Sequence, residues 1–378
     1  MYLKTLSLTN FKNYEYAKII FSPRINCFVG NNGVGKTNIL DAVHYLSLTK
    51  SFFYAVDSIG IHHGEDYFII DGVFVKKGEE DQIYCAFQRQ KQKVMKKNGK
   101  VYQKLSDHVG NYPVVMISPA DSVLISEGSG ERRRFFNKII SQYDTEYLDS
   151  VLNYNKALQQ RNRLLKEFGS SGKFDRDSIL IWDAQLVKYG KYVHRQRTDL
   201  VNELIPVFRQ NYSMISSGKE SVRMAYRSHL SDADFAGALV SSLDRDRFLG
   251  YTTVGVHKDD LVLEMDGHPV KQLGSQGQQK SYLVALKLAK FEYIRRKSGI
   301  PPVLLLDDIF DKFDAERVGQ IIRLVGNGRF GQILITDTHE SRLREILAAH
   351  DTDYKLFIIK NNKINEVIHN GIRINETE

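Results

Sequence analysis

The sequence is poor in cysteine and has no long apolar run, no internal repeat and no low-complexity segment. Its two cysteines, Cys27 and Cys85, offer no disulfide framework, which favours a reducing cytoplasm. No stretch approaches the roughly 18 apolar residues that indicate a membrane span, and the opening residues lack the pattern of a secretory signal. We therefore expect a cytoplasmic globular protein that has no membrane partner.

The charge of the chain is mildly one-sided. Its 378 residues include 53 Lys and Arg against 45 Asp and Glu, a formal net charge of +8, without a basic tail. An excess of this kind favours a polyanionic partner such as nucleic acid. Many cytosolic enzymes are mildly basic without binding nucleic acid, so charge alone leaves both readings open.

The first third of the chain reads as strands joined by turns. Strands are expected over Tyr2–Leu8, Tyr14–Phe21 and Ile25–Val29. A glycine-rich loop and a helical pattern follow the third of these strands. Residues 66–105 are also β-rich, with a hairpin turn expected at Lys97–Lys100.

The middle of the chain is dominated by helical periodicity. Apolar residues from Phe135 to Leu152 keep the spacing of one amphipathic helix, which Gly169–Gly172 interrupts. A second helical run reaches Pro206, and helix remains the expectation to about Phe248.

Strand patterns return in the last third, at Tyr251–Val256, Leu261–Met265 and Val303–Leu306. We therefore predict an α/β head, made of residues 1–121 and 250–378, which a mainly helical insertion of residues 122–249 splits in sequence.

A phosphate-binding loop follows the third predicted strand. The segment matches the pattern G-x-x-x-x-G-K-[ST], and its residues are Gly30, Asn31, Asn32, Gly33, Val34, Gly35, Lys36 and Thr37. Its glycines let backbone N–H groups wrap a phosphate at a helix N-terminus. Lys36 is expected to reach the β- and γ-phosphates, and the Thr37 hydroxyl is expected to bind Mg²⁺. The loop therefore predicts ATP and Mg²⁺ as cofactors.

Two carboxylates end the apolar strand at residues 303–306. Asp307 suits the Mg²⁺-holding position, and Asp308 suits the position that polarises an attacking water. ABC-type ATPases usually carry Glu at the second position, and Asp is one methylene shorter, so slow turnover is expected. About 270 residues separate Asp307 from the phosphate-binding loop. This wide spacing is similar to that of ABC and SMC heads.

A polar segment precedes this strand and opens a helix. It contains Ser275, Gln276, Gly277 and Gln278, which offer a hydroxyl and free N–H groups to an anion. An ordinary helix cap would look the same, but the position shortly before Asp307 resembles the ABC signature motif. That resemblance implies that the segment faces ATP on a second subunit, so that ATP joins two copies head to tail.

The chain as a whole resembles the RecF family of ABC/SMC-type P-loop ATPases. The family-like segments stand in order at Leu8–Tyr14, Gly30–Thr37, Pro113–Pro119, Glu131–Phe136, Gly255–Leu261, Ser275–Gln278 and Leu305–Asp308. Val256 and Lys258 depart from the Pro and Arg usual in the family, and Asp311–Asp314 departs from its usual D-loop, which puts details of dimer communication in doubt.

The resemblance implies an ATP-induced homodimer that binds double-stranded DNA next to single-stranded gaps. It also implies a weak ATPase that cooperates with RecO and RecR in loading RecA, and a role in replication restart and the SOS response.

Basic clusters are the candidates for DNA contact. Lys and Arg neutralise phosphates without reading base sequence, although a charge run is more often a solvated face. The candidates are Arg132, Arg133 and Arg134; Lys93, Lys96 and Lys97; and Arg161 with Arg163 and Lys166. His339, which follows the apolar strand Gln332–Ile335, is the candidate for a switch histidine.

Three other functions remain as alternatives. A transport ATPase subunit would need a surface for a membrane partner and usually lacks so large a helical insertion. An SMC-type clamp is disfavoured because the sequence contains no long heptad segment. A non-enzymatic, ATP-gated binding module stays open because of Asp308.

Overall fold

The fold is taken from a computed structural model, which describes residues 1–378 except 231–233, 311–312, 314, 327–329, 349–352 and 375–378. The chain divides into two compact units. Unit 1 contains Met1–Asp121, Met214–Ser217 and Gln276–Glu378, and unit 2 contains Ser122–Ser213 and Gly218–Ser275. The first segment of unit 1 ends at Asp121 and unit 2 begins at Ser122, where the boundary is predicted, but unit 2 continues beyond residue 249 to Ser275. The functional domain division proposed from the sequence stays a prediction.

Unit 1 contains a six-stranded antiparallel sheet in the order β2-β1-β4-β5-β6-β7. The strands are β1 (Tyr2–Phe11), β2 (Tyr14–Ile20), β4 (Tyr67–Lys76), β5 (Glu79–Gln88), β6 (Val94–Lys97) and β7 (Lys100–Val101). The predicted hairpin at residues 97–100 is confirmed, with Lys97 paired to Lys100. Its turn residues, Asn98 and Gly99, both have positive φ, as a tight hairpin turn requires.

A seven-stranded sheet of unit 1 has the order β16-β15-β14-β3-β13-β12-β8. Its strands are β3 (Ile25–Val29), β8 (Val114–Ile117), β12 (Val303–Asp307), β13 (Ile333–Asp337), β14 (Tyr354–Lys360), β15 (Lys363–His369) and β16 (Ile372–Ile374). The five strands from β14 to β8 run parallel. β3, β8, β12 and β13 are buried along their whole length, which explains their continuous apolar sequences. Their carboxyl ends meet at one edge of the sheet.

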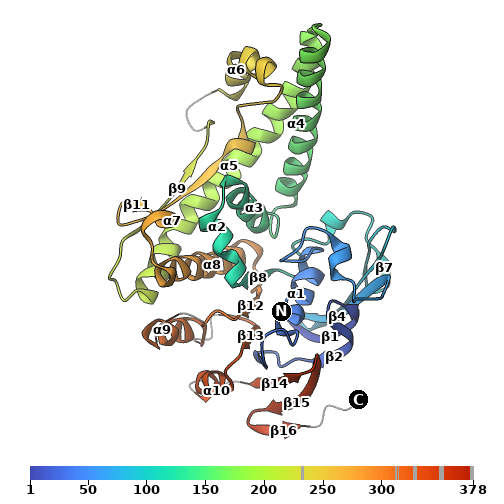
Figure 1. Ribbon diagram of the computed structural model, residues 1–378, viewed down its shortest axis with the longest axis vertical. Helices are drawn as coiled ribbons and strands as arrows, with labels where there is room; N and C mark the ends of the chain where they lie inside the picture. The colour runs from blue at the N-terminus through green and yellow to red at the C-terminus, as the bar shows by residue number, and fades with distance from the viewer. Residues whose placement is uncertain (231–233, 311–312, 314, 327–329, 349–352, 375–378) are drawn as a thin grey trace. The chain divides into compact units, whose positions relative to one another are not determined.

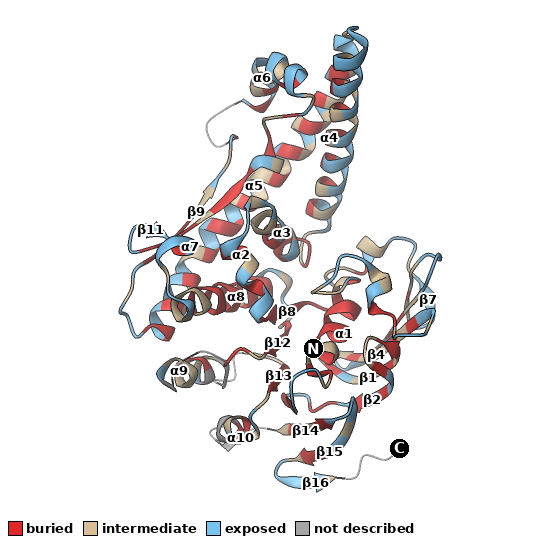
Figure 2. Ribbon diagram, in the orientation of Figure 1, coloured by how far each residue is buried: buried red, intermediate tan, exposed pale blue. Residues whose placement is uncertain are grey.

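Four helices of unit 1 are α1 (Lys36–Leu48), α8 (Gln276–Ser298), α9 (Ala315–Gly326) and α10 (Glu340–Ala348). Apolar side chains of α1 and of both sheets form one hydrophobic cluster, to which Leu40, Phe28 and Phe68 belong. Figure 2 shows α1 buried over most of its length. The helix that follows the phosphate-binding loop is therefore held over most of its length by core packing.

Unit 2 consists of helices and a small antiparallel sheet (Figure 1). Its helices are α2 (Val123–Ser126), α3 (Ser129–Ile140), α4 (Thr145–Ser171), α5 (Arg176–Ile215, the last two residues in unit 1), α6 (Phe235–Leu249) and α7 (Val270–Leu273). Its sheet has the order β11-β10-β9, with β9 (Val222–Arg227), β10 (Asp260–Met265) and β11 (His268–Pro269). α4 ends where the sequence predicts, because Gly172 adopts the left-handed conformation after its last residue.

Three predicted elements of this region differ from the structure. The single helix expected from Phe135 to Leu152 is two helices, because the side chain of Asp144 accepts a hydrogen bond from the Tyr147 N–H and caps a new start. Helix does not persist to residue 248, since β9 interrupts it with alternating buried and exposed residues.

The third difference is the strand expected at Tyr251–Val256, which does not form. Its backbone bonds side chains of the helices instead: Thr252 N donates to Asn162 Oδ1 and Thr253 N donates to Asp246 Oδ1.

Pro206 does not end α5, which continues to Ile215. Among the helices that the structure describes, none combines the length and the apolar character that a bilayer crossing requires.

Candidate nucleotide-binding site

The phosphate-binding loop joins β3 to α1, as its sequence context predicts. Gly33 and Gly35 have φ values of 84° and 97°, a backbone conformation that favours glycine. A Cβ on Gly35 would lie 2.7 Å from Asn13 Nδ2, and a Cβ on Gly30 would lie 2.5 Å from the Ile359 carbonyl oxygen. Glycine is therefore favoured at 33 and 35 by backbone conformation, and at 30 and 35 by the close approach of neighbouring segments.

Lys36 lies at the first position of α1 with its side chain folded over the loop. Its ammonium donates to the carbonyl oxygens of Gly30 at 2.7 Å and Asn31 at 3.0 Å. The residue is 3% exposed, and within the described residues its ammonium bonds these two carbonyl oxygens and no carboxylate. A buried cation without a carboxylate partner is costly unless an anion joins it. The loop therefore fits a bound phosphate.

Asp307, at the end of β12, is the centre of a cluster of hydroxyl groups. Its Oδ1 accepts hydrogen bonds from Thr37 Oγ1 at 2.7 Å and Thr336 Oγ1 at 3.0 Å. Its Oδ2 accepts from Ser118 Oγ at 3.0 Å. The carboxylate is buried and surrounded by oxygen groups, the donor set that Mg²⁺ prefers. The structure thus brings together Thr37 and Asp307, the two residues predicted to hold the metal.

Asp308 follows with φ 44°, in the left-handed region that few residues other than glycine adopt. Its backbone N–H donates to Thr336 Oγ1 at 3.0 Å, so the hydroxyl that holds Asp307 also holds the next residue. Backbone strain of this kind concentrates at functional sites. The conformation turns the chain sharply after β12, immediately beside the proposed metal ligands.

Ser118, Thr336 and Asn13 are three residues of the site that the sequence reasoning missed. Ser118 and Thr336 lie at or just after the carboxyl ends of β8 and β13, the strands that flank β12. Parallel order places such ends together, so a polar residue after each buried strand was the available signal.

Asn13 reaches the site from the turn between β1 and β2. Its Oδ1 accepts from Asn38 Nδ2 at 2.6 Å, and its Nδ2 donates to Asn362 Oδ1 at 2.8 Å. A groove of about 770 Å³, lined also by Tyr16 and His62, opens beside it. Asn13 therefore connects the phosphate-binding helix to this groove.

The signature segment stands at the start of α8. Ser275 and Gln276 are exposed, and Gly277 and Gln278 form the first turn of this 23-residue helix. Among the described residues, the hydrogen bonds of the Asp307 cluster do not extend to this segment. Its role toward a second subunit stays a prediction. The D-loop departure at 311–314 lies outside the described residues apart from Phe313.

His339, the candidate switch histidine, is exposed just before α10. Its backbone N–H donates to Asp337 Oδ1 at 2.8 Å. The residue of this segment that contacts Asp307 is Thr336, three positions earlier. The switch role of His339 stays a prediction.

The basic residues proposed as DNA contacts have different environments. The Lys93 ammonium lies inside unit 1, bonded to Asp57 at 2.8 Å and to Thr49 O at 2.6 Å. Lys97 pairs with Asp81 at 2.8 Å and remains 40% exposed in its side chain. Lys96 is half-buried, with its ammonium 5.3 Å from the centre of the Tyr84 ring. DNA contact stays a prediction for these residues, and the burial of Lys93 makes it the least suited of them.

The arginines of α3 also differ among themselves. Arg132 bonds Asp260 through two nitrogens, at 2.6 and 3.2 Å. Arg133 donates to Ser129 Oγ and to the Asp259 carbonyl oxygen. Arg134 is 70% exposed in its side chain and pairs with Glu131 within the helix. Of the three, Arg134 is the one placed to meet a phosphate at the surface.

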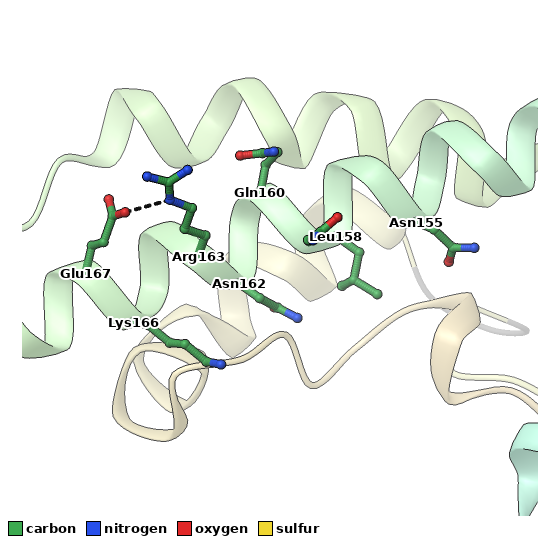
Figure 3. Close-up of a pocket in the computed structure, with 8 residues that line it drawn as sticks. Asn155, Leu158, Gln160, Asn162, Arg163, Lys166 and Glu167 are labelled. Atoms are coloured by element: carbon green, nitrogen blue, oxygen red, sulfur yellow. Dashed lines mark hydrogen bonds and ion pairs between the residues drawn. The ribbon is translucent and has the colours of Figure 1, made fainter. Parts of the chain in front are cut away.

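On α4, the prediction that Arg161 contacts DNA at the surface is wrong. Arg161 is fully buried and pairs with Asp183 at 2.5 Å and Asp246 at 2.7 Å. Arg163 and Lys166 are exposed along a hollow of about 690 Å³ on α4. Figure 3 shows Arg163 directed at Glu167 and Lys166 extending from another side of the helix. Helical spacing separates three basic residues that stand close in sequence.

The Gly255–Leu261 segment forms part of the interior of unit 2. A Cβ on Gly255 would lie 2.3 Å from the Tyr154 hydroxyl, which itself bonds His257 Nδ1 at 2.8 Å. Asp259 pairs with the buried Arg197 at 2.7 Å. Burial lowers the pKa of His257 to about 4. This family-like segment therefore holds the helices of unit 2 together.

A loop of this kind between a strand of a parallel sheet and a helix, with an acidic residue at the end of another strand of that sheet, defines a P-loop nucleotide-binding protein. The family model described as RecF/RecN/SMC N terminal domain matches residues 2–365. The chain belongs to this family.

Relatives are similar over nearly the whole chain. A protein of Phocaeicola vulgatus named DNA replication and repair protein RecF is 48% identical over 368 residues, which cover 97% of this chain and 98% of the relative. A protein of the same name from Flavobacterium johnsoniae is 46% identical over 357 residues, covering 94% and 99%.

Solved structures agree with this. The recombination mediator protein RecF in the RecFOR pathway, with ATPrS, superposes with a TM-score of 0.85 at 29% identity and covers 96% of this chain and 97% of its own. The Smc head domain of Pyrococcus furiosus bound to part of ScpA reaches a TM-score of 0.57 at 16% identity over 97% and 96%, which shows the fold alone. The predicted ABC/SMC-type ATPase head and the resemblance to the RecF family are confirmed.

Proposed function

We propose that the chain is an ATP-dependent DNA-binding protein of recombinational repair and a slow, Mg²⁺-dependent ATPase. The observation that carries the proposal is the contact between Thr37 and Asp307. It is made beside the buried Lys36, which has no carboxylate partner among the described residues. The name of the relatives, DNA replication and repair protein RecF, supports the DNA partner. Such a protein would act in the cytoplasm, where bacterial DNA lies.

The chain's own residues supply the binding chemistry. The backbone of Gly30–Gly35 and the Lys36 ammonium would hold the phosphates, and Thr37 and Asp307 would hold Mg²⁺. Bound Mg²⁺ neutralises charge on the phosphates. Asp308 would orient the attacking water from a strained position, and its short side chain is the reason to expect slow turnover.

The partner proposals follow from the family. Ser275, Gln276, Gly277 and Gln278 would meet ATP held by a second copy, so that ATP binding creates the homodimer and hydrolysis releases it. The dimer would bind double-stranded DNA near single-stranded gaps. With RecO and RecR it would promote RecA loading, which supports replication restart and the SOS response. The solved RecF described as part of the RecFOR pathway supports this assignment.

Within this proposal, residues 1–121 and 250–378 act as the ATPase head, and residues 122–249 act as the inserted lobe. The exposed Arg134 and the half-buried Lys96 and Lys97 are the first candidates for phosphate contact. Such contacts would be salt-sensitive and independent of base sequence.

Asp308 also favours a second candidate, an ATP-gated binding module in which hydrolysis hardly matters. The alternative also includes an ABC-type ATPase that acts as a transporter subunit. If Asp308→Asn left the steady-state ATPase rate unchanged, this would count against the catalytic role of Asp308 and favour the binding module.

The test of the main proposal is sedimentation of the full chain with gapped duplex DNA, with and without ATP, beside Lys36→Met. We expect dimers on DNA in the presence of ATP, and their loss in the variant. A chain that stays monomeric and ignores DNA with and without ATP would overturn the DNA-repair proposal.

A further inference from the structure

Ser118, Asp121 and Lys287 form a connected group beside Asp307 that the proposed chemistry does not use. All three residues belong to unit 1 and are at most 6% exposed. Ser118 follows β8, Asp121 lies in the short turn after it, and Lys287 is in the middle of α8. Their hydrogen bonds run in sequence from α8 to the proposed metal ligand.

The first link holds the Asp307 carboxylate from the side opposite Thr37. Ser118 Oγ donates to Oδ2 at 3.0 Å, whereas Thr37 Oγ1 donates to Oδ1 at 2.7 Å. With Oδ2 engaged by Ser118, Oδ1 is the oxygen that stands beside the Thr37 hydroxyl. The orientation of a carboxylate ligand depends on such supporting hydrogen bonds, which tune metal affinity.

The second link fixes Ser118 itself. Its backbone N–H donates to Asp121 Oδ2 at 3.0 Å, while the N–H of Asp121 donates to the carbonyl oxygen of Ser118 at 2.9 Å. The two residues thereby close a tight turn. This turn determines where the Ser118 hydroxyl stands relative to Asp307.

The third link is a buried ion pair. The Lys287 ammonium lies 2.5 Å from Asp121 Oδ1 and 3.3 Å from the Met116 carbonyl oxygen, and 5.4 Å from the centre of the Phe52 ring. Burial makes such a pair costly to break. α8 is the same helix that the signature segment opens, so the pair joins that helix to the turn that carries Ser118.

We propose that Ser118 is a positioning residue for the metal-binding carboxylate, and that the Asp121–Lys287 pair holds Ser118 in place. The proposal rests on the Mg²⁺–ATP site proposed above. Its consequence is that α8 affects how strongly the site uses Mg²⁺ without touching nucleotide or metal. The effect should therefore appear in the Mg²⁺ dependence of nucleotide binding, separately from nucleotide affinity without metal.

The experiment is a titration of the full chain with a fluorescent, non-hydrolysable ATP analogue, first in EDTA and then at increasing Mg²⁺. In Ser118→Ala we expect the Mg²⁺ concentration for half-maximal effect to rise about tenfold, the scale of one hydrogen bond to a charged group. Affinity in EDTA should match the wild type. Ser118→Thr, which keeps the hydroxyl, should restore most of the Mg²⁺ response.

The matched control is Ser47→Ala, which removes another buried serine hydroxyl of unit 1, one that within the described residues bonds only the Val43 carbonyl oxygen. It should leave the Mg²⁺ response unchanged. Lys287→Met should shift the response in the same direction as Ser118→Ala. The combination of both changes should add little, because both act through one contact. If Lys287→Met does not fold, the neutral pair Asp121→Asn with Lys287→Met replaces it.

The outcomes separate the two proposals. A wild-type chain whose nucleotide affinity ignores Mg²⁺ would refute the metal site and the positioning role with it. A wild type that responds, beside a Ser118→Ala variant that responds equally, would overturn the positioning role alone. Equal losses of affinity in EDTA and in Mg²⁺ would also overturn it, since they indicate a general structural defect.

Discussion

The buried charges of the nucleotide site in unit 1 and those of the interior of unit 2 differ in their bonding partners. In unit 1, Lys36 donates to backbone carbonyl oxygens, and Asp307 is surrounded by hydroxyl groups. In unit 2, Arg161 and Arg197 each pair directly with buried carboxylates. The paired charges of unit 2 stabilise their own fold. Lys36 and Asp307 have no partner of opposite charge in the part of the chain that the structure describes, an arrangement that suits a ligand bringing the missing partners.

The largest effect on stability should follow from breaking the compensated network. Arg161→Met would leave Asp183 and Asp246 buried without their cation, at a cost of about 3–5 kcal/mol in the free energy of unfolding. Urea unfolding measures it. Arg163→Met on the same helix, where the side chain is exposed, is the control and should change the free energy by less than about 0.5 kcal/mol. Equal effects of the two changes would contradict the structural role of Arg161.

In the nucleotide site the corresponding change should affect function and spare stability. Asp307→Asn keeps the size of the side chain and removes a buried negative charge that no cation compensates in the described residues. We expect ATP turnover to fall about 100-fold or more, because Mg²⁺ loses its carboxylate, and the free energy of unfolding to change by less than about 1 kcal/mol. Steady-state ATPase and urea unfolding test both halves. If Asp307→Asn lowered the free energy of unfolding as much as Arg161→Met, the proposed difference between the buried charges of the two units would be contradicted.

His108 in unit 1 and His257 in unit 2 should make the fold sensitive to acid. Burial lowers the pKa of His108 in unit 1 and of His257 in unit 2 to about 4, from the ordinary value of 6.5. Between these pH values the unfolded chain binds protons that the folded chain does not. Each histidine therefore removes stability as the pH falls below 6.5, by about 1.4 kcal/mol per pH unit.

The measurement is the free energy of unfolding at pH 7 and pH 5, for the wild type and for His108→Gln and His257→Gln. Each variant should lose about 2 kcal/mol less than the wild type over this range. A pH dependence that neither variant reduces would show that the buried imidazoles are not its cause.

A smaller effect on stability than that of Arg161→Met should come from Gly250→Ala in unit 2, which we compare with Gly35→Ala in unit 1. Gly250 ends α6 with φ 71°, and among the described residues a Cβ there would meet only Lys166 Cγ, at 3.5 Å. Gly250→Ala should cost about 1–2 kcal/mol and leave ATP binding unchanged. Gly35→Ala would place a Cβ 2.7 Å from Asn13 Nδ2, so ATP affinity should fall at least about tenfold. Nucleotide titration of both variants measures the difference, and equal affinities would refute the steric role of Gly35.

Local patterns were sufficient for the elements that carry strong chemistry. The loop from Gly30 to Thr37 was recognised with its flanking strand and helix, and the apolar run before Asp307 was recognised as a buried strand. Both patterns depend on residues adjacent in sequence. The structure places the loop and the end of this strand in contact, through Thr37 and Asp307, as a shared Mg²⁺ site would require.

Patterns were insufficient where side-chain partners distant in sequence decide the conformation. Tyr251–Val256 has the composition of a strand, but its backbone bonds Asn162 and Asp246. Arg161 was interpreted as a surface cation, because nothing in its neighbourhood shows that Asp246 lies 85 positions away in sequence yet 2.7 Å away in space. Likewise, the carboxylate that holds Lys93 is Asp57. Partners of this kind are invisible to periodicity.

By itself, the sequence determined the class of fold, the phosphate-binding loop and the pair of carboxylates after a buried strand. Each of these features depends on residues that are adjacent in sequence and have a fixed chemical role. Only the tertiary structure decided which charges are compensated. Arg161, Arg132 and Lys93 resemble Arg134 in sequence, and their burial beside carboxylates separates them from it. The group of Ser118, Asp121 and Lys287 also depends on the tertiary structure. Parallel strands bring Ser118 to Asp307, 189 positions away in sequence, and a packed helix brings Lys287 to Asp121, 166 positions away.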